Sequence, residues 1–406
     1  MKMTQDEALQ TLMAGNNVFL TGKPGAGKTH TVNRFVDYLK SRGIRYAVTA
    51  STGIAATHIG GTTIHSWAGL GIKREITEDV LEKILNNEYT VRRIQDPQVL
   101  IIDEVSMLDA TMINNINYVM QQVRGDGPFG GVQIVLVGDF FQLPPVVRGE
   151  KEIIFAFEAQ AWRDANPVTC YLTEQHRQSE PEFLDILNAM REGTVTEEHK
   201  RILLQEREGE EPKTMLFTHN LDVNVVNSNE LKKLPGNSRV FQMETGGNPY
   251  LVERLQEYCL APVTLKLRIG AVVMFVRNNF DRGYANGTIG TVVEWADNGL
   301  PVVETNDGER IVPEMAEWTF EEYGQTKAFI QQIPLRLAWA ITVHKSQGMS
   351  LDSAMVDLSK CFEVGQGYVA ISRVRSLSKL WLRGMNDKVF DMHPKIVEQD
   401  KKFRGV

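Results

Sequence analysis

Short apolar runs alternate with longer mixed stretches along the first 145 residues. Four runs, NVFLTG, RYAVTAS, VLIID and QIVLVGD, are rich in β-branched and aliphatic residues, and a helix is expected after the first, from Lys28 to Ser41. Strands that are apolar along their whole length are typical of a parallel sheet with helices on both faces. The pattern therefore predicts an α/β domain.

A second series of the same kind begins near Thr214 and is interrupted. TMLFTHN and AVVMFVRN are expected to be strands around a helical LDVNVVNSNELKKL, and the series resumes after Ile333 with SAMVDLS, a helix and LSKLWLRG. Between them, short strand patterns joined by Gly, Asn and Asp turns favour a small antiparallel barrel. The expected domains are a first one over 1–174 with a short charged insert near 71–96, a second over 175–283 and 335–406, and the inserted barrel over 284–334.

Composition places the chain among ordinary soluble globular proteins. It has 406 residues, of which 42% are hydrophobic and 23% charged. No apolar run approaches a membrane span, and the first residues lack a signal peptide's apolar core. We therefore expect no membrane partner and a cytoplasmic location, nucleoid-associated in a bacterium. Three isolated cysteines and eight histidines without metal-ligand spacing favour neither a disulfide framework nor a zinc site.

The net charge of −7 is unevenly distributed along the chain. Residues 284–334 hold nine acidic and two basic residues, whereas residues 335–406 hold seven acidic and twelve basic ones. The total argues against indiscriminate nucleic-acid binding. The distribution still leaves room for a local basic surface.

The segment GKPGAGKT, Gly22 to Thr29, fits the phosphate-binding pattern G-x-x-x-x-G-K-[ST]. It lies between an expected strand and an expected helix, which is the context that this pattern requires. Backbone N–H groups would surround the phosphates, Lys28 would reach the β- and γ-phosphates, and Thr29 would hold Mg²⁺. The predicted cofactors are ATP and Mg²⁺. The other cofactor-binding candidates are Gly22, Gly25, Ala26 and Gly27 in this segment, and His30 directly after it.

An acid pair follows the apolar run VLII. Asp103 is a candidate Mg²⁺ ligand, because an aspartate at the end of such a strand has this role in P-loop enzymes. Glu104 would accept the proton of an attacking water. A module that only binds nucleotide does not need Glu104, so the pair favours hydrolysis over a surface pair of acids.

The segment VGDFFQLPPV would leave the sheet at the same carboxyl edge, where ligands bind in such folds. Gln142 would reach the γ-phosphate or the attacking water, and the two prolines would stiffen the loop. The alternative is a tight, well-packed turn.

Two arginines lie beyond the first domain, Arg177 in LTEQHRQ and Arg373 in YVAISRVRS. An arginine inserted at the transition state raises the rate of phosphoryl transfer by about 10³–10⁵, which would make both residues catalytic. Without further context, a solvated or ion-paired surface position is the commoner role of an arginine.

Taken in order, these segments resemble the Pif (petite integration frequency) family of superfamily-one DNA helicases. The resemblance runs through GKPGAGKT, TASTGIAA, GGTTIHSWAGLG, DEVSM, VGDFFQLPPV and LTEQHRQ, and continues through FTHN, MFVRN, ITVHKSQGMSLD and GYVAISRVRS. It covers the chain from Met3 to about Gly384. The stretch ending VRGDGPFGGVQ is similar to the family's signature helix and loop.

The resemblance implies two RecA-like domains with ATP between them, which would make Arg177 and Arg373 arginine fingers. It also implies that Gln5 contacts adenine and that Gly348 contributes to the nucleotide site. The inserted barrel would be the small barrel of these helicases, and the charged insert the arm at the point of strand separation.

The resemblance further implies that single-stranded DNA crosses both domains. Most candidate contacts are neutral groups that bond phosphate without reading sequence. His65 and Phe140 would also stack on bases, while a helix cap or core packing is the alternative for every candidate. The candidates are Thr49, Thr52, Thr63, His65, Phe140 and Pro145 in the first domain, and Asn220, Asn278, Thr342, His344 and Ser346 in the second.

The function implied by the resemblance is an ATP-dependent DNA helicase. It would move 5′ to 3′ on single-stranded DNA as a monomer and unwind forked or tailed duplex DNA. One rival is a RecD-like or relaxase-type motor, against which the PFGG segment and the compact chain count. Another is a P-loop regulatory ATPase without a DNA substrate, which leaves ITVHKSQG and the paired arginines unexplained.

Overall fold

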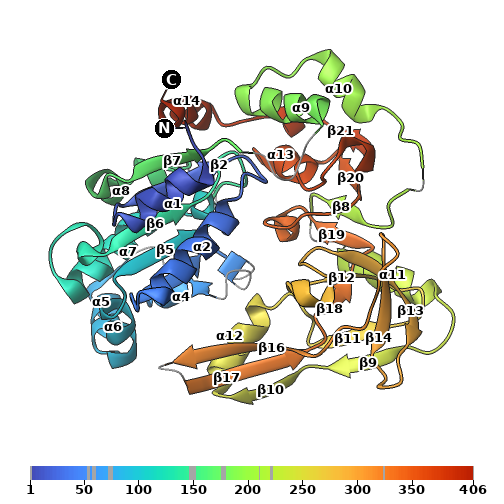
Figure 1. Cartoon of the computed structure of the whole chain (residues 1–406), viewed down its shortest axis with the longest axis horizontal. Helices are drawn as coiled ribbons and strands as arrows, with labels where there is room; N and C mark the ends of the chain where they lie inside the picture. The colour runs from blue at the N-terminus through green and yellow to red at the C-terminus, as the bar shows by residue number, and fades with distance from the viewer. Residues whose placement is uncertain are drawn as a thin grey trace. The chain divides into compact units, whose positions relative to one another are not determined.

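The computed structural model describes residues 2–52, 55–56, 61–71, 76–145, 152–174, 180–209, 211–219, 223–322 and 325–405. The chain divides into two compact units (Figure 1). Unit 1 comprises residues 1–179, 191–193 and 392–406, and unit 2 comprises residues 180–190 and 194–391. Within the described residues, no helix is both long enough and apolar enough to cross a membrane.

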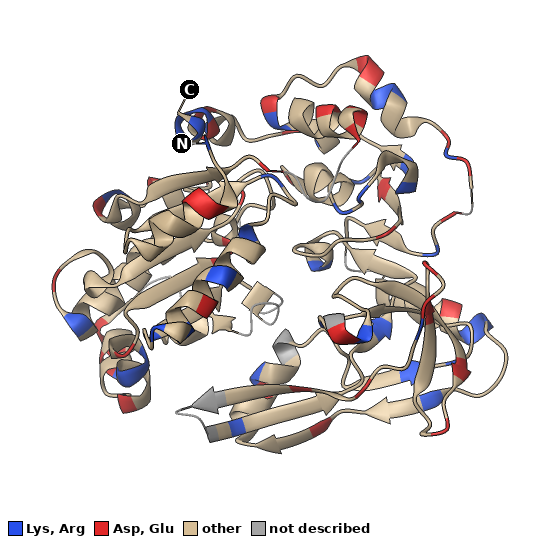
Figure 2. Cartoon of the chain, viewed as in Figure 1, with Lys and Arg blue, Asp and Glu red and all other residues tan. Residues whose placement is uncertain are grey.

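Unit 1 is built on a seven-stranded sheet in which all neighbouring strands are parallel. The order β1-β7-β2-β6-β5-β3-β4 places the strand that precedes GKPGAGKT between β7 and β6. The five longer strands are almost entirely tan in Figure 2, because Asp103 is their one charged residue. The strands are β1 (Lys2–Met3), β2 (Val18–Gly22), β3 (Tyr46–Ala50), β4 (Thr62–Thr63), β5 (Val99–Asp103), β6 (Gln133–Val137) and β7 (Val168–Leu172).

Helices cover both faces of this sheet. Apolar residues of α1 and α2 pack on one face, and the other face carries an aromatic cluster that includes side chains from α8 and α14. A capping box at Thr4 and Glu7 fixes the start of α1. The helices of unit 1 are α1 (Gln5–Met13), α2 (Lys28–Ser41), α4 (Ile64–Trp67), α5 (Glu78–Leu85), α6 (Glu88–Gln95), α7 (Ala110–Arg124), α8 (Gln160–Ala165) and α14 (Pro394–Arg404).

Unit 2 combines one parallel sheet with antiparallel ones. The parallel sheet has the order β19-β8-β20-β21, and its strands are β8 (Met215–Phe217), β19 (Ala340–Thr342), β20 (Ala354–Leu358) and β21 (Leu380–Met385). The helices are α9 (Pro181–Glu192), of which the last two residues belong to unit 1, α10 (Glu197–Leu204), α11 (Val223–Lys233), α12 (Pro249–Tyr258) and α13 (Gln366–Ile371).

Residues 239–337 of unit 2 form three antiparallel sheets, with the orders β15-β14-β13-β12-β18, β10-β17-β16 and β11-β9. Their strands are β9 (Arg239–Gln242), β10 (Glu244–Gly247), β11 (Thr264–Leu267), β12 (Val272–Phe275), β13 (Ile289–Trp295), β14 (Pro301–Thr305), β15 (Arg310–Ile311), β16 (Ala316–Glu322), β17 (Gln325–Gln332) and β18 (Leu335–Leu337).

The predicted fold class is confirmed, with two parallel α/β sheets and additional antiparallel sheets. One strand assignment is wrong: AVVMFVRN contains β12, which pairs antiparallel with β13 and β18 instead of joining the parallel sheet. A buried apolar strand has the same sequence pattern in either kind of sheet, so periodicity does not separate them. The antiparallel sheets span residues 239–337, a wider range than the expected 284–334.

The C-terminal residues also differ from the expected domain division. Residues 392–406 pack within unit 1, whereas the sequence pattern placed them in the second domain. The physical reason is aromatic packing, because the Phe403 ring lies 4.9 Å from the Phe19 ring, between centroids.

Candidate nucleotide site

GKPGAGKT forms a tight loop between β2 and α2. Gly27, the residue before the helix, has a φ of 87°, which residues with side chains rarely adopt. A Cβ at this position would also collide with the side-chain amide of Gln5. The glycine therefore allows the loop to close against Gln5, whose Nε2 donates to the Ala26 carbonyl over 3.4 Å.

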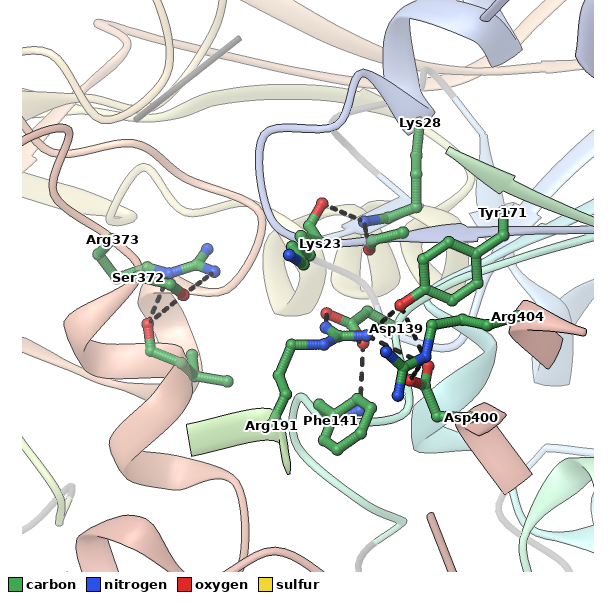
Figure 3. Close-up of polar contacts among 12 residues, drawn as sticks. Lys23, Lys28, Asp139, Phe141, Tyr171, Arg191, Ser372, Arg373, Asp400 and Arg404 are labelled. Carbon is green, nitrogen blue, oxygen red and sulfur yellow. Dashed lines mark hydrogen bonds and ion pairs between the residues drawn. The ribbon is translucent and has the colours of Figure 1, made fainter. Parts of the chain in front are cut away.

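The Lys28 ammonium points back at this loop. Its Nζ donates to the carbonyl oxygens of Gly22 at 2.8 Å and Lys23 at 3.3 Å (Figure 3). Burial lowers the pKa of Lys28, while the carboxylates of Asp139 and Glu104 oppose that shift. A cation that is poorly solvated is well suited to bind a phosphate group.

The acid pair lies at the end of β5. Asp103 Oδ1 accepts the N–H of Glu104 at 2.8 Å, and Glu104 itself has a left-handed φ of 50°. This conformation costs a non-glycine residue about 1–3 kcal/mol and is found mainly at functional sites. Burial raises the pKa of Asp103, while the bond from Glu104 and the charge of Lys28 oppose the rise.

Oxygen donors are the groups available here for a cation. Thr29 has an exposed side chain in the first turn of α2, beside the exposed His30, and Asp103 ends β5. Among the residues that the structure describes, no group of three or more His, Cys, Asp or Glu is arranged to hold a metal ion. Mg²⁺ is usually held by one or two carboxylates together with substrate phosphates, so this small donor set fits Mg²⁺.

The loop after β6 turns sharply at Asp139. The Asp139 carbonyl accepts the N–H of Gln142 at 3.0 Å, and its Oδ1 accepts the N–H of Phe141 at 3.2 Å. Gln142 is 5% exposed, and no group in the described part of the chain donates to its Oε1. A buried acceptor without a partner costs free energy. This oxygen is therefore suited to accept a hydrogen bond from a water molecule.

Phe140 lies in the core instead of facing DNA. It is 5% exposed, and its ring centroid lies 5.5 Å from that of Phe19, 6.1 Å from that of Trp162 and 6.2 Å from that of Phe403. The expectation that Phe140 stacks on bases is corrected by this packing. The sequence did not reveal it, because three of its ring partners come from β2, α8 and α14, far away along the chain. Pro145, also expected at the DNA, is buried too.

Phe140→Ala is therefore expected to destabilise unit 1 by about 3–5 kcal/mol, the usual cost of truncating a buried aromatic side chain. Urea unfolding followed by fluorescence measures the change. Tyr118→Ala, at a position with 43% exposure on α7, is the control and should have little effect. An unchanged unfolding midpoint for Phe140→Ala, together with weaker binding of single-stranded DNA, would show instead that Phe140 contacts DNA.

The other DNA candidates of unit 1 have mostly structural bonds. Thr49 is buried, and its hydroxyl donates to a carbonyl of β5 over 2.8 Å. Thr63 caps α4, and the hydroxyl of Thr52 accepts a backbone N–H three residues later. His65 is half-buried, and burial lowers its pKa. Of this set, Thr52 and His65 keep partly exposed side chains.

Three candidates of unit 2, Thr342, His344 and Ser346, lie at the end of β19 or directly after it. Thr342 and Ser346 are buried, and their hydroxyls bond to backbone groups of the same turn. His344 Nε2 lies 3.0 Å from Glu363 Oε2, and both side chains are partly exposed. Asn278 is exposed on the loop after β12. Arg177 and Asn220 lie outside the described residues.

Arg373 is deeply buried, with 1% exposure. Its guanidinium donates to the carbonyls of Val369, Ser346 and Met349 at 2.9–3.2 Å. It therefore fixes the turn after β19, which includes Gly348 with a φ of 77°. Arg373 is therefore not at a solvated surface position, which is the commoner place of an arginine.

Sequence reasoning missed one buried charge network in unit 1. Arg191, near the end of α9, is paired with Asp139 in the loop that carries Gln142 and also contacts Tyr171 and Asp400 (Figure 3). No motif marks Arg191, which precedes a glutamate and a glycine at a helix end. The buried aspartate directly after an apolar strand was the one available signal.

Comparison with known proteins decides the family. Residues 3–201 match the model of the PIF1-like helicase family, and residues 250–295 match the 2B domain of DNA helicase Pif1. The ATP-dependent DNA helicase Pif1 of Psychrobacter sp. is 42% identical over all of this chain and 71% of its own length. The chain belongs to the PIF1-like helicase family. It spans 62–63% of the length of its vertebrate family members.

Solved structures of PIF1-like helicases have the same fold. The Bacteroides sp. protein in complex with ADP-AlF4 has a TM-score of 0.86 and 31% identity, covering 99% of this chain and 96% of that one. A Bacteroides protein with ADP-AlF3 and single-stranded DNA has a TM-score of 0.66 at 30% identity, covering 99% and 98%. A structure described as two coordinating Pif1 helicases at forked double-stranded DNA has a TM-score of 0.66 and 31% identity, covering 99% of this chain and 96% of that one. Membership in this family removes the relaxase-type motor and the regulatory ATPase as alternatives.

Proposed function

We propose that this chain, an ATP-dependent DNA helicase of the PIF1-like family, uses ATP hydrolysis in unit 1 to translocate 5′ to 3′ on single-stranded DNA. The observation that carries the proposal is the constellation around the P-loop. Lys28 supplies a poorly solvated cation, Glu104 a carboxylate on a strained turn, and Gln142 a buried acceptor without a partner.

In the proposed mechanism, each residue of this constellation has one task. Lys28 exchanges its two carbonyl partners for phosphate oxygens, and Glu104 accepts the proton of the attacking water. Gln142 Oε1 accepts a hydrogen bond from the other O–H of that water, and this bond orients the water. Gln5, which lies against the P-loop, forms the adenine side of the site.

Thr29 and Asp103 would hold Mg²⁺, which would neutralise charge on the β- and γ-phosphates. Both provide oxygen, and two protein ligands are enough when phosphates supply others. The arginine fingers proposed for this chain are Arg177 and Arg373. For Arg373 this requires that the guanidinium exchange some of its backbone carbonyl bonds for phosphate oxygens.

The proposed DNA path uses the exposed candidates of each unit. Support comes from a relative of 30% identity that was solved with ADP-AlF3 and single-stranded DNA. Thr52 and His65 in unit 1, with Asn278 and His344 in unit 2, have accessible polar groups for phosphate. We propose that the chain acts as a monomer on a single strand and that forked or tailed duplex DNA is its unwinding substrate.

Direction is tested with matched duplexes that carry one single-stranded tail. Substrates with a 5′ tail are expected to unwind in the presence of ATP, and the same duplexes with a 3′ tail are not. Fluorescence separation of labelled strands measures both rates. Unwinding from the 3′ tail alone would refute the proposed direction while leaving the family assignment in place.

A further inference from the structure

Asp139, which shapes the Gln142 turn, is held by a buried arginine. Nη1 of Arg191 lies 2.9 Å from one oxygen of the Asp139 carboxylate and 2.8 Å from the other. The exposed fractions of the two side chains are 4% and 1%. A charge pair removed from water to this extent is costly to break from one side, because the remaining charge stays buried.

The same guanidinium also holds the other side of the turn. The Cζ of Arg191 lies 4.1 Å from the centre of the Phe141 ring, a distance typical of a cation–π contact. Asp139 and Phe141 together bracket the turn whose next residue is Gln142. Arg191 therefore contacts this turn on two sides, without being part of it.

The pair is also electrically linked to the phosphate site. The negative charge of Asp139 raises the pKa of Lys28, and the positive charge of Arg191 lowers it. Arg191 likewise lowers the pKa of Lys23 in the P-loop, after the larger effect of burial. A displacement of Arg191 would thus change the field at the ammonium that binds phosphate.

Two elements meet Arg191 from the opposite side. Its Nη2 donates to the hydroxyl of Tyr171 over 2.9 Å and lies 3.4 Å from Asp400 Oδ1. Asp400 belongs to α14 and is paired with Arg404 at 2.9 Å. This side of the network anchors α14 and does not touch the Gln142 turn.

Helix α9 is shared between the units. Its residues 181–190 belong to unit 2, while Arg191 and Glu192 belong to unit 1. Before its first turn, Glu180 Oε2 accepts the N–H of Leu377 at 2.8 Å within unit 2. A helix of 12 residues is a stiff rod of about 18 Å. Each end is therefore tied to a different unit by charged side chains.

We propose that Arg191 is a positioning residue that couples the Gln142 turn to α9, so that a change at the phosphate site is transmitted to unit 2 through this helix. The proposal rests on the proposed role of Gln142 at the attacking water. It assigns a function to a residue outside the nucleotide and DNA contacts. A purely structural ion pair would instead stabilise unit 1 without affecting the response to DNA.

Arg191→Lys in the full chain tests this coupling. Lysine keeps a positive charge beside Asp139 but lacks the planar fork that serves three partners at once. With saturating single-stranded DNA, kcat for ATP hydrolysis is expected to fall at least about tenfold, a loss within the usual range of coupling between two sites. The KM for ATP should change by less than about threefold. The ratio of DNA affinities with ADP-aluminium fluoride and with ADP should move towards one.

Three further variants make the result decisive. Asn has nearly the same shape as Asp, and Asp139→Asn should reproduce the fall in DNA-stimulated kcat. The variant that combines Arg191→Lys with Asp139→Asn should have a kcat no lower than either single variant, because the pair acts as a unit. Asp400→Asn breaks only the α14 side and should lower Tm while keeping the normal stimulation by DNA.

The proposal is overturned if Arg191→Lys and Asp139→Asn lower the DNA-free and the DNA-stimulated turnover by the same factor. It is also overturned if Asp400→Asn reduces stimulation as strongly as they do. Failure of the proposed function has a different signature, because the unsubstituted chain would then show no stimulation by DNA.

Discussion

Lys28→Ala is expected to reduce ATP turnover by at least about a hundredfold, since removal of one preorganised electrostatic contact from a phosphoryl-transfer or oxyanion site costs about 10²–10³. The Lys28 ammonium already bonds to the P-loop carbonyls at 2.8 and 3.3 Å and lies where burial lowers its pKa. Alanine leaves no cation at position 28. Steady-state phosphate release with and without single-stranded DNA measures the loss.

Arg34→Ala is the matched control for Lys28→Ala. Arg34 lies on the same helix, α2, and forms an exposed ion pair with Asp6 at 2.7 Å. Exposed pairs contribute little to stability, so turnover should be close to that of the unsubstituted chain. DNA binding by Lys28→Ala should remain within a few-fold, because the proposed DNA contacts are on other loops. Turnover of Lys28→Ala at more than a tenth of the normal rate would show that GKPGAGKT is not the hydrolytic site.

Gln142→Ala is expected to have the second-largest effect. DNA-stimulated hydrolysis and unwinding should fall by about a hundredfold, since Gln142 is proposed to orient the attacking water. Stability should not fall in parallel, because the substitution removes a buried acceptor that has no partner. ATP affinity, DNA affinity and Tm, measured on the same preparation, separate a catalytic loss from misfolding.

Gln133→Ala provides a control at the opposite end of the same strand. Its Nε2 donates to the carbonyls of Leu12 at 2.9 Å and Asn16 at 2.7 Å, so alanine should lower Tm but leave kcat nearly unchanged. Gln142→Ala should therefore lower the rate but not Tm, whereas Gln133→Ala should lower Tm but not the rate. If Gln142→Ala unwinds DNA normally, the VGDFFQLPPV loop is only a stiff turn.

The sequence predicted four strands of the unit 1 sheet, β2, β3, β5 and β6, because each lies in a largely apolar run. The short strands β1 and β4 and the edge-side strand β7 were not predicted. GKPGAGKT and Gln142 follow strands of one parallel sheet and Asp103 ends another, so their position at a common edge was predictable from topology. The antiparallel assignment of β12 was not predictable, because its apolar run has no feature that distinguishes the two kinds of sheet.

Contacts between distant segments set the limit of sequence reasoning. Phe140 was expected at the DNA because of the family resemblance, but rings from β2, α8 and α14 pack against it. Arg191 had no motif and gained its place from Asp139, which lies 52 positions earlier in the chain. Hydroxyl groups such as those of Thr49 and Ser346 fit phosphate binding and backbone bonding equally well by composition, and packing decided between them.

The position of α14 has a consequence for how the protein is made. Tyr171 of β7 pairs with Lys2 of β1 and donates from its hydroxyl to Asp400 of α14, so both extremes of unit 1 meet at one strand. Chains emerge from the ribosome in order, at about 5–20 residues per second. Residues 392–405 emerge only after all of unit 2 has been synthesised. The packing of Phe403 on Phe19 and Phe140 therefore cannot form until unit 2 has been synthesised, although Trp162 can already cover both rings before then.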